Sequence, residues 1–277
     1  MKNDIIERRH GALIQHGPKS ARIYVMECAG ANPETLVQEL LLLGAERGYG
    51  KIFAKVPELA SAAFLRAGFH EEARIPGFFA GEETALFLAL FIDTRRARSV
   101  DEGEIERIVT LAVNAEVRSP GPLPDGCMLR ICTPDDIPAM SSIYREVFPT
   151  YPFPIEDPAW LLETMRTHVD YYGVSCEGRL VALASSEMDL EGGSVEMTDF
   201  ATLPDWRGNA LALHLLQEME EGMRRKGMKT AYTIARALSG GMNITFARRG
   251  YQFSGTLVNN TNISGGIESM NVWFKPL

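Results

Sequence analysis

The residues from Asp199 to Ala212 have the types and spacing best suited to chemistry in this chain. An apolar segment, residues 195–203, ends at Pro204; a polar loop with Arg207 and Gly208 then leads into an amphipathic run. This order predicts a strand, a loop and a helix. A helix that begins after a glycine-containing turn presents unpaired backbone N–H groups and the positive end of its dipole. With the charge of Arg207, the stretch predicts a phosphate or pyrophosphate site.

Charge and composition narrow the ligands for such a site. The chain has 277 residues, a formal net charge of -8, 45% hydrophobic residues and 23% charged residues. Proteins that bind nucleic acids depend on clustered Lys and Arg, so this balance argues against a nucleic-acid partner. A cationic small molecule or an amine fits better. The length is sufficient for two domains of ordinary size.

No targeting or membrane segment is expected. Residues 1–10 are not followed by an apolar stretch, and no window reaches the roughly 18 apolar residues of a membrane span. We therefore expect a cytoplasmic protein. The cysteines Cys28, Cys127, Cys132 and Cys176 show no Cys-x-x-Cys pairing and no His at ligand spacing. This pattern predicts buried or idle thiols in a reducing compartment and no metal site.

The elements that must position the predicted anion site follow a regular order. Alternating apolar residues and tight turns predict an antiparallel meander before the Arg207 loop, with helices opened by Pro134 and Pro158. A strand, a helix and a hairpin follow the helix after the loop. The expected strands are residues 128–133, 172–176, 180–188, 195–203 and 230–235, and the hairpin arms are 252–258 and 267–274.

The first part of the chain repeats the order strand, helix, strand, helix, hairpin. Strands are expected at residues 22–28 and 51–56, and hairpin arms at 78–79 and 84–92. The run Phe64-Leu-Arg-Ala-Gly-Phe69 matches Phe246-Ala-Arg-Arg-Gly-Tyr251 at an offset of 182. Such helix-Gly-strand corners are also common by chance, so the alternative is that no repeat exists.

The two copies differ at the loop before the first helix. The first copy has Ala29-Gly-Ala-Asn32 where the second has Trp206-Arg-Gly-Asn209. The first copy is therefore expected to pack against and shape the second without binding the phosphate. Three prolines and a glycine in residues 119–124 can neither continue a helix nor pair fully in a sheet. They predict two domains, residues 1–124 and residues 125–277.

Residues 204–212, Pro-Asp-Trp-Arg-Gly-Asn-Ala-Leu-Ala, resemble the Arg/Gln-x-x-Gly-x-Gly/Ala loop of the GNAT N-acetyltransferases. The resemblance implies a mixed α+β fold, with a central, mostly antiparallel twisted sheet flanked by helices, preceded here by a smaller, degenerate GNAT-like half. It implies acetyl-CoA as co-substrate, held by its pyrophosphate, and Ala210 stands where glycine is usual. The positions to which donor binding carries over are Phe200, Ala201, Thr202, Arg207, Gly208, Asn209, Ala210, Leu211, Ala212 and Ser239.

Four further runs resemble the β-lysine N6-acetyltransferase family more specifically. They are residues 230–237, 241–246, 258–262 and 268–275. This resemblance implies an acetyl group moved to the 6-amino group of β-lysine for osmolyte synthesis. The acceptor follows from the resemblance alone. Two alternatives remain, namely another small amine or a peptide amine as acceptor, and a non-catalytic acyl-CoA-binding module.

Acetyl transfer to an amine needs a group that removes a proton from the nitrogen. Glu196 and Asp199 lie on the strand before the loop, but at a separation of three they face opposite sides unless a bulge intervenes. The family resemblance favours Asp199 as base or amine anchor, with Glu196 as the alternative. Many GNAT enzymes have a tyrosine general acid at the position of Phe246. That role is therefore unfilled here, or is taken by Tyr232 or water.

The acceptor itself is expected to be bound near the last hairpin. Glu268 could hold an ammonium group, while amides such as Asn260 and Asn271, or an arginine, hold a carboxylate. The alternative is a solvated, turn-forming Asn-rich loop. Ser239 could cap a helix instead of contacting the donor. The expected partner is a small-molecule amine without nucleic acid or membrane, and a homodimer is one expected assembly.

Overall fold

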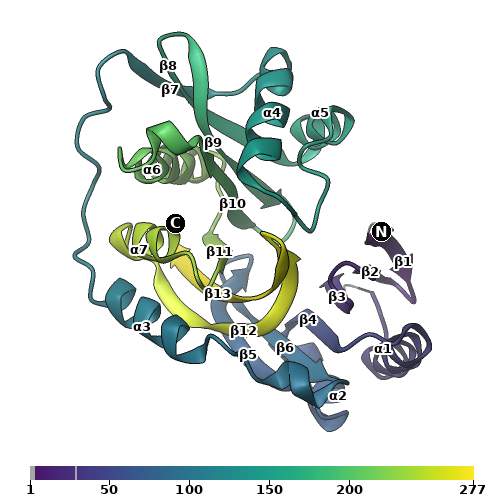
Figure 1. Ribbon diagram of the computed structural model, residues 1–277. Coiled ribbons are helices and arrows are strands. Elements are labelled where there is room, and N and C mark those ends of the chain that lie inside the picture. The colour runs from purple at the N-terminus through teal and green to yellow at the C-terminus, as the bar shows by residue number, and fades with distance from the viewer. Residues whose placement is uncertain (1–3, 29) are drawn as a thin grey trace.

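The computed structural model describes residues 4–28 and 30–277, in which the strands form a six-stranded and a seven-stranded sheet (Figure 1). Residues 1–3 and Ala29, the first residue of the loop compared above, lie outside the described residues. The elements of the first sheet and its helices are β1 (Ile5–Arg9), β2 (Ala12–Gly17), β3 (Arg22–Glu27), α1 (Pro33–Arg47), β4 (Lys51–Pro57), α2 (Ala62–Arg66), β5 (His70–Phe79) and β6 (Glu83–Phe91).

The second sheet carries the meander and the hairpin expected from the sequence. Its strands are ordered β12-β13-β11-β10-β9-β8-β7, and α4, α5 and α6 pack on it. Its elements are β7 (Cys127–Ile131), α4 (Ile137–Val147), α5 (Pro158–Thr167), β8 (Val169–Cys176), β9 (Arg179–Asp189), β10 (Ser194–Thr202), α6 (Leu211–Arg225), β11 (Thr230–Arg236), α7 (Gly240–Arg248), β12 (Gln252–Ile263) and β13 (Gly266–Pro276).

The predicted internal repeat is confirmed by the sheet topology. The strands run β3-β4-β6-β5 in the first sheet and β10-β11-β13-β12 in the second, and the leading pair is parallel in both. Corresponding helices end at glycines in the left-handed region, Gly48 (φ 66°) with Gly227 (φ 80°) and Gly68 (φ 92°) with Gly250 (φ 79°). Only glycine adopts this conformation at low cost, which explains why these positions gave a readable signal. The sequence did not predict the additional β1–β2 hairpin.

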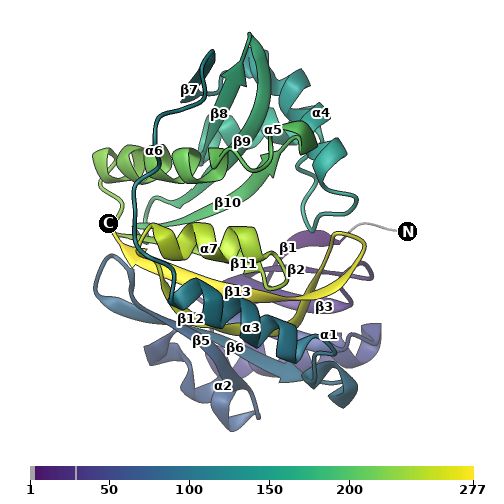
Figure 2. The same cartoon turned by 60° about the vertical axis from the view of Figure 1, so that its left-hand side comes forward.

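Helix α3 (Glu102–Val113) precedes the predicted boundary at residue 124 but packs against α7, as Figure 2 shows. Its Ala112 belongs to the core of the second half. Farther on, the backbone N–H of Arg118 donates to the carbonyl of Arg248 at 2.9 Å. The chain therefore crosses onto the second half before the proline-rich segment. The division into residues 1–124 and 125–277 stays a prediction.

The two halves share a core and close backbone contacts. Phe53, Phe78 and Phe87 of the first half pack in one buried cluster with Tyr232 and Leu257 of the second. Strands β5 and β12 approach so closely that a Cβ on Gly255 would lie 2.0 Å from the carbonyl oxygen of Glu72. Glycine is required at this crossing for that reason. The halves thus form one body.

An irregularity in β10 creates the opening in the second sheet. Its register with β9 shifts between Thr198 and Ala201, and Asp199 has a φ of 53°. The parallel pairing of β10 with β11 covers only the pairs from Ser194↔Thr230 to Glu196↔Tyr232. Beyond this point β10 pairs with β9 but not with β11. The main-chain groups on the β11-facing edge of the later part of β10 are therefore available to a ligand.

One expectation about the cysteines is wrong. Strands β7 and β8 place Cys127 opposite Cys176 with their Cα atoms 4.0 Å apart, and the two sulfurs form a disulfide. Because the pair is 49 residues apart and joined only by strand register, its spacing carried no local signal. Cys28 and Cys132 are free thiols. No helix in the described part of the chain is long and apolar enough to cross a membrane.

Candidate functional site

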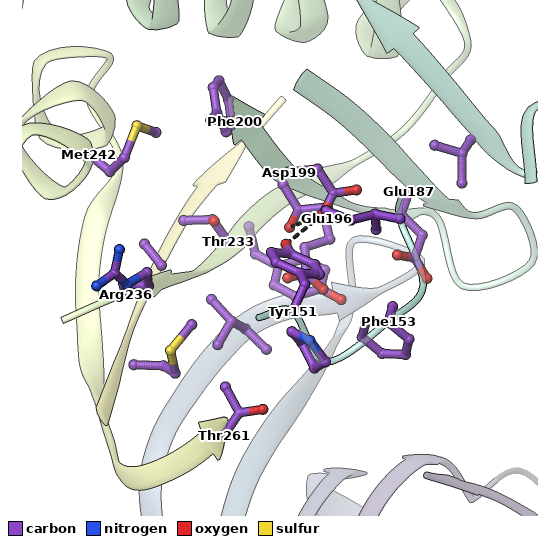
Figure 3. A pocket seen from close by; sticks show the side chains of 18 of the residues that line it. Tyr151, Phe153, Glu187, Glu196, Asp199, Phe200, Thr233, Arg236, Met242 and Thr261 are labelled. Atoms are coloured by element: carbon purple, nitrogen blue, oxygen red, sulfur yellow. Dashed lines mark hydrogen bonds between the residues drawn. The ribbon is translucent and has the colours of Figure 1, made fainter. Parts of the chain in front are cut away.

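A cavity of about 1520 Å3 lies between the two halves and is lined by residues of both (Figure 3). The second half contributes the later part of β10, the Arg207 loop and β11. The first half contributes residues of β3 and β4, among them Arg22, Tyr24 and Lys55. The degenerate half therefore forms one wall of the cavity.

The Arg207 loop has the features of an anion site. In the described chain, no carbonyl or side chain accepts a hydrogen bond from the amide groups of residues 208–212. Ala210, just before α6, adopts a φ of 54° and provides no side-chain cap. The side chain of Arg207 donates only to the carbonyl of Thr202, at 3.3 Å. Free amides, the helix dipole and one cation converge at the cavity edge.

Most of the predicted donor-binding residues lie in the cavity wall. Ala201 is fully buried in the core, and the exposed Asn209 donates its side-chain amide to the carbonyl of Trp206. Neither of these two side chains lines the cavity. Those that do are Phe200, Thr202, Arg207, Gly208, Ala210, Leu211, Ala212 and Ser239.

The bulge in β10 brings both predicted carboxylates to the same cavity, as Figure 3 shows for Glu196 and Asp199. Asp199 accepts hydrogen bonds from the hydroxyl of Tyr151 at 2.5 Å and from that of Ser185 at 2.7 Å. Burial raises the pKa of Asp199, and these two hydrogen bonds oppose the rise. The Asp199 carboxylate is thus held in a fixed orientation.

Glu196 has a different environment. Its enclosure between the halves and the nearby charge of Glu187 raise its pKa to about 8. Burial and Asp199 raise the pKa of Glu187 to about 7, while the ammonium of Lys55 favours the charged form of both glutamates. A carboxyl with a pKa close to the working pH is suited to accepting a proton. Three acidic groups in one wall also favour a cationic ligand.

Several of these groups were missed in the sequence. Tyr151 lies in a Pro- and aromatic-rich loop, and Glu187 lies on β9 without a motif around it. Lys55, on β4, donates to the hydroxyl of Tyr232 at 3.5 Å although the two are 177 residues apart. Tyr232, considered for proton donation, does line the cavity. Residues 148–158 are rich in aromatic residues. This was the one sequence feature that could have drawn attention to Tyr151, and it indicated only a loop.

The predicted acceptor-binding residues separate into two groups. Asn260 lines the cavity and is only 1% exposed. Glu268 forms two hydrogen bonds with the guanidinium of Arg236, at 2.7 and 2.9 Å, and does not line the cavity. Asn271 is fully buried and donates to the side-chain oxygen of Asn243. The structure therefore brings Asn260, but neither Glu268 nor Asn271, to the cavity wall.

The position of the expected general acid is apolar. Phe246 is buried on α7 and packs edge-on against Phe200 and Tyr251. Within the described residues, no group of His, Cys, Asp and Glu side chains is placed to hold a metal ion. The ionisable groups of the wall include carboxylates, tyrosines, Lys55, Arg22 and Arg207.

Comparisons with known proteins agree with this geometry. The acetyltransferase (GNAT) family model matches residues 137–251. The chain is 37% identical to a β-lysine N(6)-acetyltransferase of Methanococcus maripaludis, over 95% of this chain and 96% of that protein. It is 30% identical to the N-acetyltransferase YodP of Bacillus subtilis, over 96% of each. A β-lysine N(6)-acetyltransferase of Methanosarcina mazei is also 30% identical, over 88% of this chain and 97% of that protein.

Proposed function

The chain belongs to the GNAT family of N-acetyltransferases, and from this premise we propose that it transfers the acetyl group of acetyl-CoA to the 6-amino group of β-lysine. The observation that carries the proposal is the cavity. At one edge lies the anion cradle, formed by Arg207 and the free amides of residues 208–212, and one wall carries the carboxyl groups of Glu187, Glu196 and Asp199. The near full-length similarity to two β-lysine N(6)-acetyltransferases supports the choice of acceptor.

The groups along the cavity match the parts of the donor. The free amides of residues 208–212 and the side chain of Arg207 would hold the pyrophosphate. The edge of β10 beyond Glu196 that faces β11 without pairing to it would bind the pantetheine arm. Acetyl-CoA supplies an activated thioester, whose carbonyl would lie near the bulge at Asp199.

The protein's main task toward the acceptor is to make its amine neutral. A lysine-type amine has a pKa of about 10.4, so holding it neutral at pH 7 costs about 4.6 kcal/mol. We assign proton removal to Glu196, whose pKa is raised to about 8, acting directly or through a water molecule. The nitrogen then bonds to the acetyl carbon, the carbon–sulfur bond breaks with its electron pair on sulfur, and the second proton of the nitrogen passes to the thiolate, directly or through water. No covalent enzyme intermediate is needed.

We assign a positioning role to Asp199. Its two oxygens already accept hydrogen bonds from Tyr151 and Ser185, so it is less available as a base than Glu196. A fixed carboxylate next to the predicted thioester can orient the incoming amine. Glu187 adds negative charge that suits a substrate with two ammonium groups.

An acceptor panel tests the proposal. The protein is incubated with acetyl-CoA and β-lysine, lysine, a simple diamine or a peptide with a free amine, and release of the CoA thiol is followed. We expect the highest kcat/KM with β-lysine. Faster turnover with a different amine would replace the acceptor, and acetyl-CoA binding without turnover of any amine would favour a binding module.

A further inference from the structure

Arg22, on β3 of the first half, is a buried cation in the cavity wall. It is 4% exposed, and its guanidinium donates to the carbonyl of Asn260 at 2.9 Å and to the side-chain oxygen of Gln15 at 3.5 Å. Its Nε has no hydrogen-bond partner. Among the residues that the structure describes, no carboxylate lies within 4.0 Å of this guanidinium.

Arg22 differs from several cations nearby in that its carboxylate neighbours, Asp4 and Glu72, act on its pKa only from beyond salt-bridge distance. Lys51, on the neighbouring strand and equally enclosed, is paired with Glu72 at 2.7 Å. Arg236 is paired with Glu268, and the charge of Lys55 acts on Glu187 and Glu196. An unpaired buried cation is destabilising by several kcal/mol, so an anionic ligand at Arg22 gains affinity from relieving this penalty. Burial lowers the pKa of Arg22 to about 10, which still leaves it charged near neutral pH.

A hydrogen-bond acceptor without a partner, on Asn260, lies beside Arg22. The side-chain oxygen of Asn260 is buried without a hydrogen-bond partner, and its backbone carbonyl is already bound to Arg22. A cation and a free amide oxygen next to one another match the carboxylate and the neighbouring ammonium of an amino acid. A diamine without a carboxylate would leave Arg22 unpaired.

The spacing also fits the proposed acceptor. Tyr24 lies two residues after Arg22 on the same face of β3, about 7 Å along the strand, and its ring centroid is 5.2 Å from the Arg22 guanidinium carbon. Tyr24 in turn lies close enough to Glu196 for that charge to raise its pKa. In β-lysine, the six bonds between the carboxyl carbon and the 6-amino nitrogen span about 7 Å when extended. An extended β-lysine is therefore about as long as the step along β3 from Arg22 to Tyr24, the neighbour that lies toward Glu196.

We propose that Arg22 binds the carboxylate of the acceptor, with Asn260 accepting from its neighbouring ammonium, so that the non-catalytic half selects amino acids over simple diamines. This inference rests on the proposed function and deepens it. Arg22 acts on binding and not on the reacting atoms. Its loss should therefore appear mainly in the KM of the acceptor.

The test compares β-lysine with 1,4-diaminopentane, which is the same diamine without the carboxylate. For the unaltered protein we expect kcat/KM to favour β-lysine by about 100-fold, the range of a charged hydrogen-bonded pair. Arg22→Gln should lower kcat/KM for β-lysine by about 100-fold through KM and change the value for the diamine by less than about threefold. Arg22→Lys should restore part of the preference, since it keeps the charge.

Lys51→Gln is the matched control. Lys51 is as buried as Arg22 and also joins the halves, donating to the carbonyl of Val258 at 2.8 Å, but it does not line the cavity. This variant should lower the melting temperature and keep the acceptor preference. Equal losses for both acceptors in Arg22→Gln would overturn the proposal, as would equal use of both by the unaltered protein. In the latter case acetyl transfer still stands, whereas acetylation of neither acceptor would remove the proposed function itself.

Discussion

The helix starts of the two copies, α1 and α6, occupy the same place in the repeat but differ in their free backbone donors. At α1, Pro33 has no N–H, and the side chain of Asn32 accepts from the N–H of Thr35 at 3.1 Å. At α6, Ala210 provides no cap, and residues 208–212 keep their amides free. The first copy thus neutralises its own anion site, while the second preserves it. We therefore expect phosphate binding to depend on this loop sequence and not on the fold alone.

The leading parallel strands differ in the same way. Tyr24 pairs with Phe53 in the first copy at the register position where Glu196 pairs with Tyr232 in the second. The first copy places an aromatic ring where the second places an acid, yet both side chains face the shared cavity. Under the proposed function, the second copy supplies the reacting groups and the first supplies a wall of the cavity. This division predicts different outcomes for matched changes in the two halves.

The largest expected effect follows from removing the acid of the second copy. Glu196→Gln should lower kcat by about 1000-fold, in the range of a lost general base. In the unaltered protein, kcat/KM should rise as the pH passes about 8, because the Glu196 carboxyl must lose its proton before it can accept another. The Glu196→Gln variant should lose this rise near pH 8, which is the ascending limb of the pH profile. Initial rates between about pH 6 and 10 measure both effects.

Tyr24→Phe is the matching change in the first copy and should keep the limb near pH 8. If Glu196→Gln retains that limb as well, the base is a different group, and Asp199→Asn becomes the next variant to measure. A rate loss without any change in the pH profile would indicate a positioning role for Glu196.

The next largest effect is expected on acetyl-CoA binding, from a change at Arg207 in the anion cradle. Arg207→Glu should weaken acetyl-CoA binding by about 100-fold, since it replaces an attractive charge at the helix start by a repulsive one. Isothermal titration calorimetry with acetyl-CoA measures it. Arg47→Glu, on the exposed surface of α1, makes the same change in net charge away from the cavity. A similar loss of affinity in both variants would show that the net charge of the protein, and not the position of Arg207, controls acetyl-CoA binding.

The cap of the first copy should affect stability alone. Asn32→Ala leaves the N–H of Thr35 without its acceptor, so the free energy of unfolding should fall by about 1 kcal/mol. Urea denaturation measures the change, and acetyl-CoA affinity should stay as it was. Weaker donor binding in this variant would contradict the assignment of the cradle to the second copy only.

The smallest effect is expected at the left-handed residue before α6. Ala210→Gly removes a methyl group at a φ of 54° and should stabilise the fold by up to about 1 kcal/mol. It should also tighten acetyl-CoA binding by about threefold, because the phosphates can approach the amides more closely. Ala80→Gly, at a φ of 55° outside the cavity wall, should stabilise the fold without changing donor affinity.

Local features of the sequence allowed much of the fold to be predicted. Helix α5 begins at Pro158 as expected, and the side chain of its cap residue Asp157 accepts from the N–H of Ala159. The chain ends several helices at glycines that adopt positive φ. These signals act over a few residues, so they can be read without knowing the rest of the structure.

The bulge at Asp199 marks the limit of that reasoning. Strict alternation placed Glu196 and Asp199 on opposite faces, whereas the register shift after Thr198 brings both to the cavity. The same limit applies to the disulfide of Cys127 with Cys176, which depends on how two strands align. A one-residue irregularity in pairing changes which face a side chain occupies and has no fixed sequence pattern.

The sequence by itself determined the order of most elements and the repeat, and it predicted the anion site, because each signal is read from residues adjacent in the chain. Only the tertiary structure decided that the first half closes the cavity with Arg22 and Lys55, and that Tyr151 restrains Asp199. These contacts join residues far apart in sequence, as with Arg22 and Asn260, which are separated by 238 residues. Spacing along the chain records nothing of such pairs, since they arise from the packing of one sheet against another.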